Sequence, residues 1–202
     1  MDEFNILIAG VGGQGVLFIS ELLGEAAIKS GLNVKVAEIH GMAQRGGSVI
    51  CSVRIGEKVF SPTIDDGRAH SIIALEPIEA LRYLKYANSK TIVALNINKI
   101  EPPGIYMSGK KYPEIDFILE RLKVVTRNIL AIDALKLADK AGNPATQNTV
   151  MLGLISASKK LPINTQLLKK TLIRLTQKKF QKPNETAFNH GFESYEKSKI
   201  LS

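Results

Sequence analysis

The chain of 202 residues contains a single cysteine, Cys51, and no tryptophan. One cysteine excludes an internal disulfide framework, and it cannot supply the several thiolates that an iron–sulfur cluster or a structural zinc site requires. Such low cysteine content is typical of a reducing compartment. We therefore expect a cytoplasmic protein that binds no metal by itself.

Long apolar runs are also missing. No run approaches the roughly 18 residues of a membrane-spanning helix, and the N-terminus lacks the charged start, apolar stretch and cleavage site of a signal peptide. Aromatic residues make up 6% of the chain, which leaves little material for stacking on bases. We expect neither a membrane nor a nucleic acid as partner.

Positive charge exceeds negative charge, with 27 Lys and Arg against 19 Asp and Glu. The excess is concentrated between residues 159 and 182, a stretch without any acidic residue. Leu168, Leu172 and Leu175 recur there at helical spacing, so the cations most simply form the solvated face of an amphipathic helix. A docking surface for something negative is the alternative.

Alternating apolar runs and glycine breaks predict an α/β fold with a Rossmann-like, mainly parallel sheet. A strand over 4–9, a helix over 16–31 and a strand over 33–39 form the first βαβ unit, and further parallel strands are expected over 71–75 and 91–95. A hairpin of 48–55 and 58–60, joined by Gly56 and Glu57, makes the sheet mixed. We also expect short strands over 105–107 and 124–128, and helices over 77–84, 115–122, 132–141, 146–158, 165–180 and 185–199. The chain reads as one domain over 1–202 whose helical C-terminal region begins near residue 145.

The first glycine turn is the clearest motif. Gly10, Gly12 and Gly15 fit GxGxxG directly after a strand and at the start of a helix, where unpaired N–H groups and the helix dipole favour an anion. Glu38, near the end of the second strand, could accept hydrogen bonds from a ribose, as in a dinucleotide site. The alternative is that these glycines only permit close packing of strand and helix.

A second polar segment, residues 38–48, follows the second strand at the edge where open α/β sheets bind ligands. Arg45 offers a planar donor fork suited to carboxylate or phosphate, and Gln14 and Gln44 offer amides. Gly46 and Gly47 would let a partner approach the backbone. His40 is ambiguous, because a lone histidine is more often a hydrogen-bonded structural residue.

Four segments together resemble the gamma-type subunit of 2-oxoacid:ferredoxin oxidoreductases: GVGGQGVLFISELLGEAA, AEIHGMAQRGGSVICSVRIG, LEPIEALRYL and GNPATQNTVMLGLI. They span most of the chain up to about Ile155, and GGQG followed by QRGGS at this separation is more specific than either motif alone. Within the family, the EIHGMAQRGGSV segment is most similar to subunits that serve indolepyruvate. Gamma subunits that serve pyruvate or 2-ketoisovalerate are the alternatives.

The resemblance implies an assembly that decarboxylates a 2-oxoacid on thiamine diphosphate and magnesium, passes electrons through iron–sulfur clusters to ferredoxin, and releases an acyl-coenzyme A. It also implies that a large partner subunit carries these cofactors, and that this chain is inactive alone and completes the active site. The residues agree, because Asp65, Asp66 and Gly67 are followed by Arg68 and not by a thiamine-diphosphate pattern. Coenzyme A is the co-substrate that the chain could contact.

Carried over residue by residue, the resemblance implies two walls that face the large subunit or coenzyme A. The first wall consists of Gly12, Gly13, Gln14 and Gly15, the second of Gln44, Arg45, Gly46, Gly47 and Ser48, with Glu38 and His40 beside it; Asn148 matches the asparagine before the family's MLG helix. None is expected to be catalytic directly, and Arg45 is expected to orient an anionic group. An independent NAD-dependent dehydrogenase and a nucleotide-sensing domain remain the alternatives.

Overall fold

The computed structural model describes residues 3–41, 46–101 and 111–199, and it contains a six-stranded mixed sheet in the order β2-β3-β1-β4-β5-β6. Its strands are β1 (Phe4–Val11), β2 (Asn33–His40), β3 (Ser48–Gly56), β4 (Ser71–Ala74), β5 (Ile92–Asn96) and β6 (Ile129–Ile132). β1, β4, β5 and β6 are parallel, whereas β3 runs antiparallel to both β1 and β2. The mixed, mainly parallel α/β class expected from the sequence is thereby confirmed.

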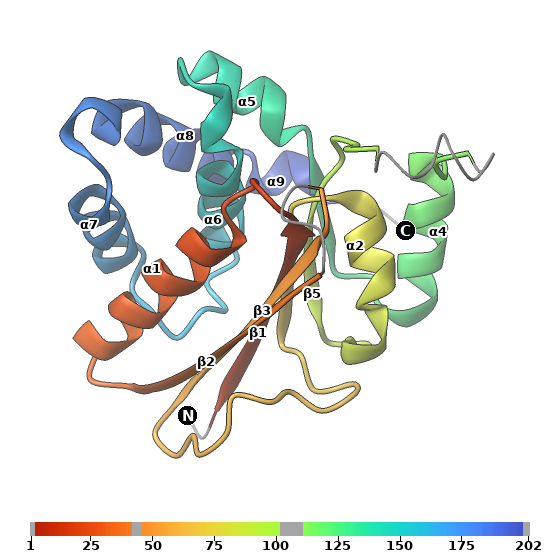
Figure 1. Cartoon of the computed structure of the whole chain (residues 1–202), viewed down its shortest axis with the longest axis horizontal. Coiled ribbons are helices and arrows are strands. Elements are labelled where there is room, and N and C mark those ends of the chain that lie inside the picture. The colour runs from red at the N-terminus through yellow and green to blue at the C-terminus, as the bar shows by residue number, and fades with distance from the viewer. Residues whose placement is uncertain (1–2, 42–45, 102–110, 200–202) are drawn as a thin grey trace.

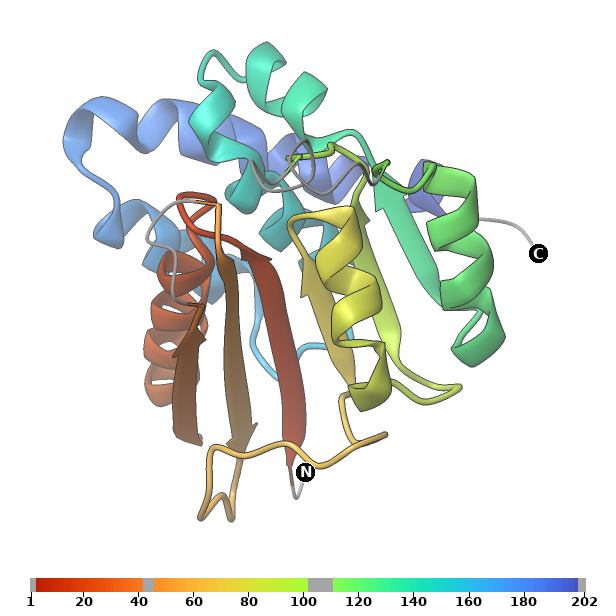
Figure 2. The same ribbon diagram turned by 45° about the vertical axis from the view of Figure 1, so that its right-hand side comes forward.

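Helices cover the two faces of this sheet unequally. Figure 1 shows α1 (Val16–Lys29), α6 (Gln147–Ala157), α7 (Thr165–Leu175) and α8 (Gln181–Glu193) on one side, and α2 (Pro77–Arg82) and α4 (Ile115–Val125) on the other. Figure 2 shows α2 and α4 over the β4–β6 half, with no helix over β2 and β3 on that face. The remaining helices are α5 (Ala134–Lys140), α9 (Tyr195–Ser198) and the 3-10 turns Leu84–Tyr86, Pro144–Thr146 and Lys178–Phe180.

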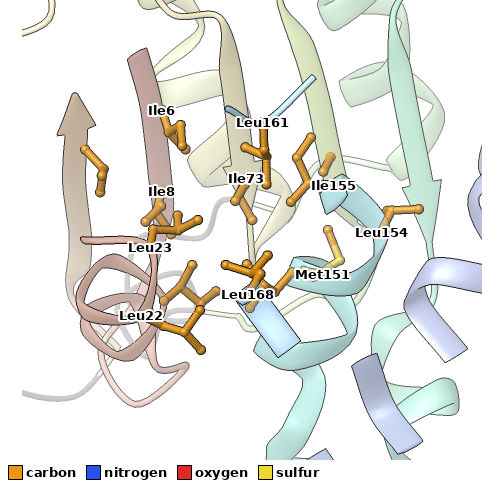
Figure 3. Close-up of a cluster of buried hydrophobic side chains, with 14 of the residues drawn as sticks. Ile6, Ile8, Leu22, Leu23, Ile73, Met151, Leu154, Ile155, Leu161 and Leu168 are labelled. Carbon is orange, nitrogen blue, oxygen red and sulfur yellow. The ribbon is translucent and has the colours of Figure 1, made fainter. Parts of the chain in front are cut away.

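The larger core lies between the sheet and α1, α6 and α7. Every residue of β1 is buried, as a central strand covered on both faces requires, and Ile6 and Ile8 point toward α1 and α6 (Figure 3). Leu168 and Leu172 are fully buried on α7, so the apolar stripe expected in the lysine-rich segment is confirmed. The cations of that segment occupy its outer face.

Close packing of α6 and α8 depends on two glycines. A Cβ atom added at Gly153 would collide with the carbonyl oxygen of Phe188, and one added at Gly191 would collide with that of Val150. Backbone contacts at these two glycines therefore hold α6 against α8. This contact fixes where the first turn of α6 lies.

The expected hairpin of 48–55 with 58–60 is wrong. Residues 58–60 form no strand, and β3 instead pairs with β2 and inserts between β2 and β1. The segment after β3 is held by side chains: Arg54 Nη1 donates to the carbonyls of Ser61 and Thr63, and Ser52 Oγ donates to that of Pro62. β2 therefore belongs to the first βαβ unit but is not the neighbour of β1.

Several boundaries differ from the expectation. The strand expected over 124–128 is wrong, because α4 continues to Val125 with Val124 80% exposed, and the strand begins at Ile129. The helix expected over 165–180 ends at Leu175, and α8 already begins at Gln181. The strand expected over 105–107 lies outside the described residues. Within those residues, no helix combines the length and apolarity needed to cross a membrane.

Candidate functional site

A cavity of about 340 Å³ lies at the carboxyl ends of β1, β4 and β5, and we call it the carboxyl-edge cavity. The chain leaves β1 toward β2 and β3 on one side and resumes at β4 on the other, so this is the topological switch point where open α/β sheets bind ligands. Its lining residues are Val11, Gly12, Gly13, Gln14, Gly46, Leu75, Asn96, Ile100, Ala145, Gln147 and Asn148. The glycine turn, Gly46 of the second polar segment and the start of α6 therefore meet at this cavity.

The glycine turn depends on its backbone conformation and, at Gly15, on a close contact. Gly13 and Gly15 have φ angles of 100° and 79°, which favour glycine. A Cβ atom at Gly15 would also collide with the Asn148 amide nitrogen. The spacing of GVGGQG is thus needed for the approach of α6 to the turn, a contact that the sequence did not reveal.

Gln14 is a wall of the cavity and not a free amide. Its Oε1 accepts the N–H of Val11 at 2.8 Å, and its Nε2 donates to the carbonyl of Leu75 at 2.7 Å. The side chain therefore fastens the turn to the end of β4. One of the two N–H donors of its amide is thereby used within the chain.

Asn96 and Gln147 are cavity residues that sequence reasoning missed. Asn96 is 1% exposed, and its Nδ2 donates to the Leu75 carbonyl (3.1 Å) and to Gln147 Oε1 (3.2 Å). Its Oδ1 accepts the N–H groups of Ala134 and Asn98. A polar residue closing the apolar run TIVAL was the available signal for this hub at the end of β5.

Two helix N-termini point toward the cavity. α1 begins after Gly15 and α6 after Thr146, and neither residue caps its helix with a side chain. Neither first turn contains an acidic residue, in contrast to α2, where Glu76 accepts the N–H groups of Ile78 and Glu79. Among the described residues no charged side chain lines the cavity, so the two helix dipoles favour an anion there.

The second predicted wall is only partly at the cavity. Gly12 N–H donates to the Gly47 carbonyl at 2.9 Å, which ties the segment to the turn, and Gly41 N–H donates to the Ser48 carbonyl at 2.8 Å, which joins the two ends of the segment. Gly46 lines the cavity. Gln44 and Arg45 lie outside the described residues.

Ser48 is directed away from the carboxyl-edge cavity, toward α2. Its Oγ donates to the Glu79 carboxylate and lies 2.8 Å from the Tyr83 hydroxyl oxygen. Glu79 is 3% exposed and also accepts from Arg82 Nε. Ser48 therefore anchors the segment to α2 and does not line the cavity.

Glu38 is not beside the glycine turn. In the sheet register, Glu38 is opposite Cys51, which is in turn opposite Ile8 on β1. Two strand spacings, about 10 Å, therefore separate Glu38 from β1, because β3 intervenes. His40 ends β2 in register with Val49. Glu38 therefore does not occupy the position of the acid that binds the ribose in a dinucleotide site. This weakens the alternative that the chain is an independent NAD-dependent dehydrogenase.

Glu76 is a buried carboxyl group next to the cavity wall. Its Oε1 accepts the Ile100 N–H at 3.3 Å and the Tyr112 hydroxyl, while its Oε2 caps α2. Burial raises the pKa of Glu76, and burial together with this carboxyl raises the pKa of Tyr112. All its oxygens are engaged, so Glu76 holds the wall in place.

Metal and thiol chemistry find no support in the described part of the chain. No group of three or more His, Cys, Asp or Glu residues there could hold a metal ion. Cys51 is buried, and burial raises the pKa of its thiol to about 11, which keeps it protonated and unreactive. Asp66 forms an ion pair with Lys85 at 3.1 Å, so it does not present a free carboxylate to a diphosphate-bound magnesium.

Fold and site together define a class of protein: an open α/β sheet with a cavity at its switch point whose described lining residues carry no charge and no acid–base pair. The pyruvate ferredoxin/flavodoxin oxidoreductase family model matches residues 5–194. The chain belongs to this family, as the motifs had led us to expect.

Relatives and solved structures agree with this membership. The chain is 42% identical to indolepyruvate oxidoreductase subunit IorB of Archaeoglobus fulgidus, over 94% of each chain. It is 40% identical to the subunit of the same name from Thermococcus kodakarensis, over 95% of each. The fold matches a keto/oxoacid ferredoxin oxidoreductase gamma subunit from Geobacter sulfurreducens with a TM-score of 0.70 and 20% identity, covering 96% of this chain and 99% of that one.

Proposed function

We propose that this chain is the small subunit of a 2-oxoacid:ferredoxin oxidoreductase that acts on indolepyruvate or related aryl pyruvates. The observation that carries the proposal is the similarity along nearly the whole chain to subunits named for indolepyruvate oxidoreductase. Oxidative decarboxylation by such an assembly requires thiamine diphosphate, magnesium and iron–sulfur clusters. The described residues of this chain do not fit these groups, so a large partner subunit would hold them.

The role of the small subunit is to close the active site of that partner. Its carboxyl-edge cavity offers backbone N–H groups and two helix N-termini, which stabilise negative charge without supplying a proton. The anion would be the carboxylate of the 2-oxoacid or a phosphate of coenzyme A. Gly12, Gly13, Gly46 and Asn148 would approach this group, while Gln14 and Asn96 keep the walls in place.

Arg45 is proposed to orient the same anion from the second wall. It belongs to the 41–48 segment, which is tied to the glycine turn by the hydrogen bond from Gly12 N–H to the Gly47 carbonyl. An Arg45→Lys variant that restores part of the activity lost in Arg45→Ala would support this role. Unchanged assembly and kinetics in Arg45→Ala would remove Arg45 from the proposal.

The proposal is tested by expressing the chain together with a candidate large subunit and purifying the complex. We expect a brown, iron-containing complex that reduces ferredoxin with coenzyme A and indolepyruvate, while the small chain alone is inactive. Indolepyruvate and phenylpyruvate should give a kcat/KM at least about tenfold above that of pyruvate and 2-ketoisovalerate, about 1.4 kcal/mol in transition-state binding. Preference for pyruvate or 2-ketoisovalerate would refute the substrate assignment, and turnover by the isolated chain would refute the subunit role.

A further inference from the structure

A second pocket, of about 590 Å³, lies at the opposite edge of the sheet, and we call it the amino-edge pocket. Four segments far apart in sequence build it: the approach to β5, the approach to β6, the turn after α6, and the C-terminal segment at α9. Its lining residues are Ser89, Lys90, Ile92, Arg127, Asn128, Ile129, Leu130, Lys160, Tyr195 and Lys199. None of them lines the carboxyl-edge cavity.

The charge of this pocket has one sign. Lys90, Arg127, Lys160 and Lys199 line it, and none of the lining residues that the structure describes carries a carboxylate. Lys199 is neutralised by Glu196 at 2.7 Å, but within the described residues the other three cations take part in no ion pair. Three uncompensated cations around one concavity concentrate positive potential there and favour a ligand with more than one negative charge.

The same pocket also has an apolar surface. Leu130 and Ile92 belong to the same core on one face of the sheet and form part of the apolar lining, whereas Ile129, which packs into the core on the other face, lines the pocket at the sheet edge. The ring of Tyr195 adds a flat aromatic wall, which Lys199 Nζ approaches to 4.6 Å from the ring centroid. An isolated bridge between Leu130 and Lys199 holds the C-terminal segment against β6, so this wall is fixed to the sheet.

We propose that the amino-edge pocket binds an organic phosphate of nucleotide size. The volume lies within the range of small-molecule sites, and such sites combine an apolar lining with a few converging polar groups. Lys90, Arg127 and Lys160 would hold the phosphates, with Arg127 able to donate two hydrogen bonds to one phosphate group. Ile92, Leu130 and Tyr195 would contact the uncharged part.

The site is independent of the proposed subunit function. It lies at the amino ends of β5 and β6, whereas the carboxyl-edge cavity lies at the carboxyl ends of β1, β4 and β5. A ligand there would not enter the reaction that we assign to the cavity. Its occupancy would instead change the C-terminal segment, through Tyr195 and Lys199, and thus the surface that this end of the molecule offers.

The test is calorimetric titration of the full chain with ADP, inorganic pyrophosphate and adenosine. We expect micromolar binding of ADP, binding of pyrophosphate about tenfold weaker, and no binding of adenosine. The Lys90→Gln/Arg127→Gln double variant should weaken ADP binding at least about tenfold. The control Lys178→Gln/Lys182→Gln removes the same charge outside the pocket and should change binding less than twofold.

A second control separates this pocket from the carboxyl-edge cavity. Gln147→Glu places a negative charge in the cavity, and it should leave ADP binding unchanged if ADP binds at the amino edge. Loss of ADP binding in this variant would overturn the proposal, because it would place the nucleotide at the glycine turn. Equal losses in the two double variants, or no ADP binding at millimolar concentration, would overturn it as well.

Discussion

The two ends of the sheet attract anions by different physical means. At the carboxyl edge, helix N-termini, backbone N–H groups and amides surround a cavity without charged side chains. At the amino edge, long cationic side chains surround an apolar floor. The first arrangement is rigid and orients a ligand, whereas the second attracts charge with little geometric demand. A site that completes a reaction needs the former property.

Of the changes that test this difference between the two sites, Gly15→Ala should have the largest effect. The new Cβ collides with Asn148, and the φ angle of 79° adds strain, so the free energy of unfolding should fall by about 2 kcal/mol or more. Chemical denaturation measures the change. Gly13→Ala is the matched control, since it has the same kind of backbone strain but no atom within 4 Å of the new Cβ. Equal losses in both variants would show that the contact with α6 does not shape the turn.

Gln147→Glu should weaken anion binding at the carboxyl edge without unfolding it. The glutamate keeps an acceptor for Asn96 and suits the first turn of α6, so the melting temperature should be unchanged or higher. In the assembled enzyme, the KM of the anion that occupies the cavity should rise about tenfold, which corresponds to about 1.4 kcal/mol. Steady-state kinetics with varied 2-oxoacid and varied coenzyme A identify that anion. Unchanged KM values for both would contradict the cavity's proposed role.

Salt concentration should affect ligand binding at the two edges of the sheet to different extents, and this difference should be smaller than the effects above. Exposed cations are screened strongly between 50 and 300 mM salt, so the affinity of the amino-edge pocket for ADP should fall by roughly severalfold. Fixed dipoles in a partly enclosed cavity are screened less, and the corresponding KM should change by less than about twofold. Titrations and kinetics in a sodium chloride series provide both slopes. Similar salt dependence of the ADP affinity and of the KM would contradict the idea that the two sites attract anions by different means.

His70, just before β4 at the amino edge, should add a small pH dependence to stability. Its Nδ1 accepts the Asn5 N–H at 2.9 Å, and burial, with a contribution from Arg68, lowers its pKa despite the nearby Glu3. A lowered pKa means that the folded state binds fewer protons than the unfolded state. This contribution to stability is therefore present above pH 6.5, the ordinary value, and is lost as the pH falls through the folded-state pKa.

Thermal unfolding between pH 5 and 8 tests this expectation. His70→Asn keeps an acceptor for the Asn5 N–H but cannot titrate, so its stability should depend less on pH below 6.5 than that of the unmodified chain. Identical slopes would show that His70 does not contribute. None of the described residues that line the carboxyl-edge cavity has a titratable side chain, so anion binding there should depend little on pH in the same range.

Much of the fold followed from local patterns. The apolar run of β1, the glycine turn and the α1 stripe lie within about 25 residues of each other, and their periodicity is legible without long-range information. The strands that pair with β3 could not be predicted from local pattern. A β-rich run pairs with whichever strand the rest of the sheet places beside it, and the side chains of Arg54 and Ser52 hold the following segment outside the ladder.

The candidate site was found in outline but not in detail. Gly12, Gly13, Gln14, Gly46 and Asn148 were expected and line one cavity, whereas Ser48 is directed to α2 and Glu38 lies on the far side of β3. Side chains on successive residues of a strand point to opposite faces, so a contiguous motif such as QRGGS need not present all its members to one ligand. Asn96 and Gln147 are each unremarkable in sequence and matter because they are hydrogen-bonded to one another.

By itself, the sequence determined the family, the α/β class and the position of the glycine turn, because these depend on residues close together along the chain. Tertiary structure alone decided that the Gln14 side chain is hydrogen-bonded to the end of β4 and that α6 packs against the glycine turn. It also decided that four separate segments bring Lys90, Arg127 and Lys160 to one pocket. The physical reason is that local pattern sets which faces of an element are apolar, whereas the ends of elements meet only after those faces have packed.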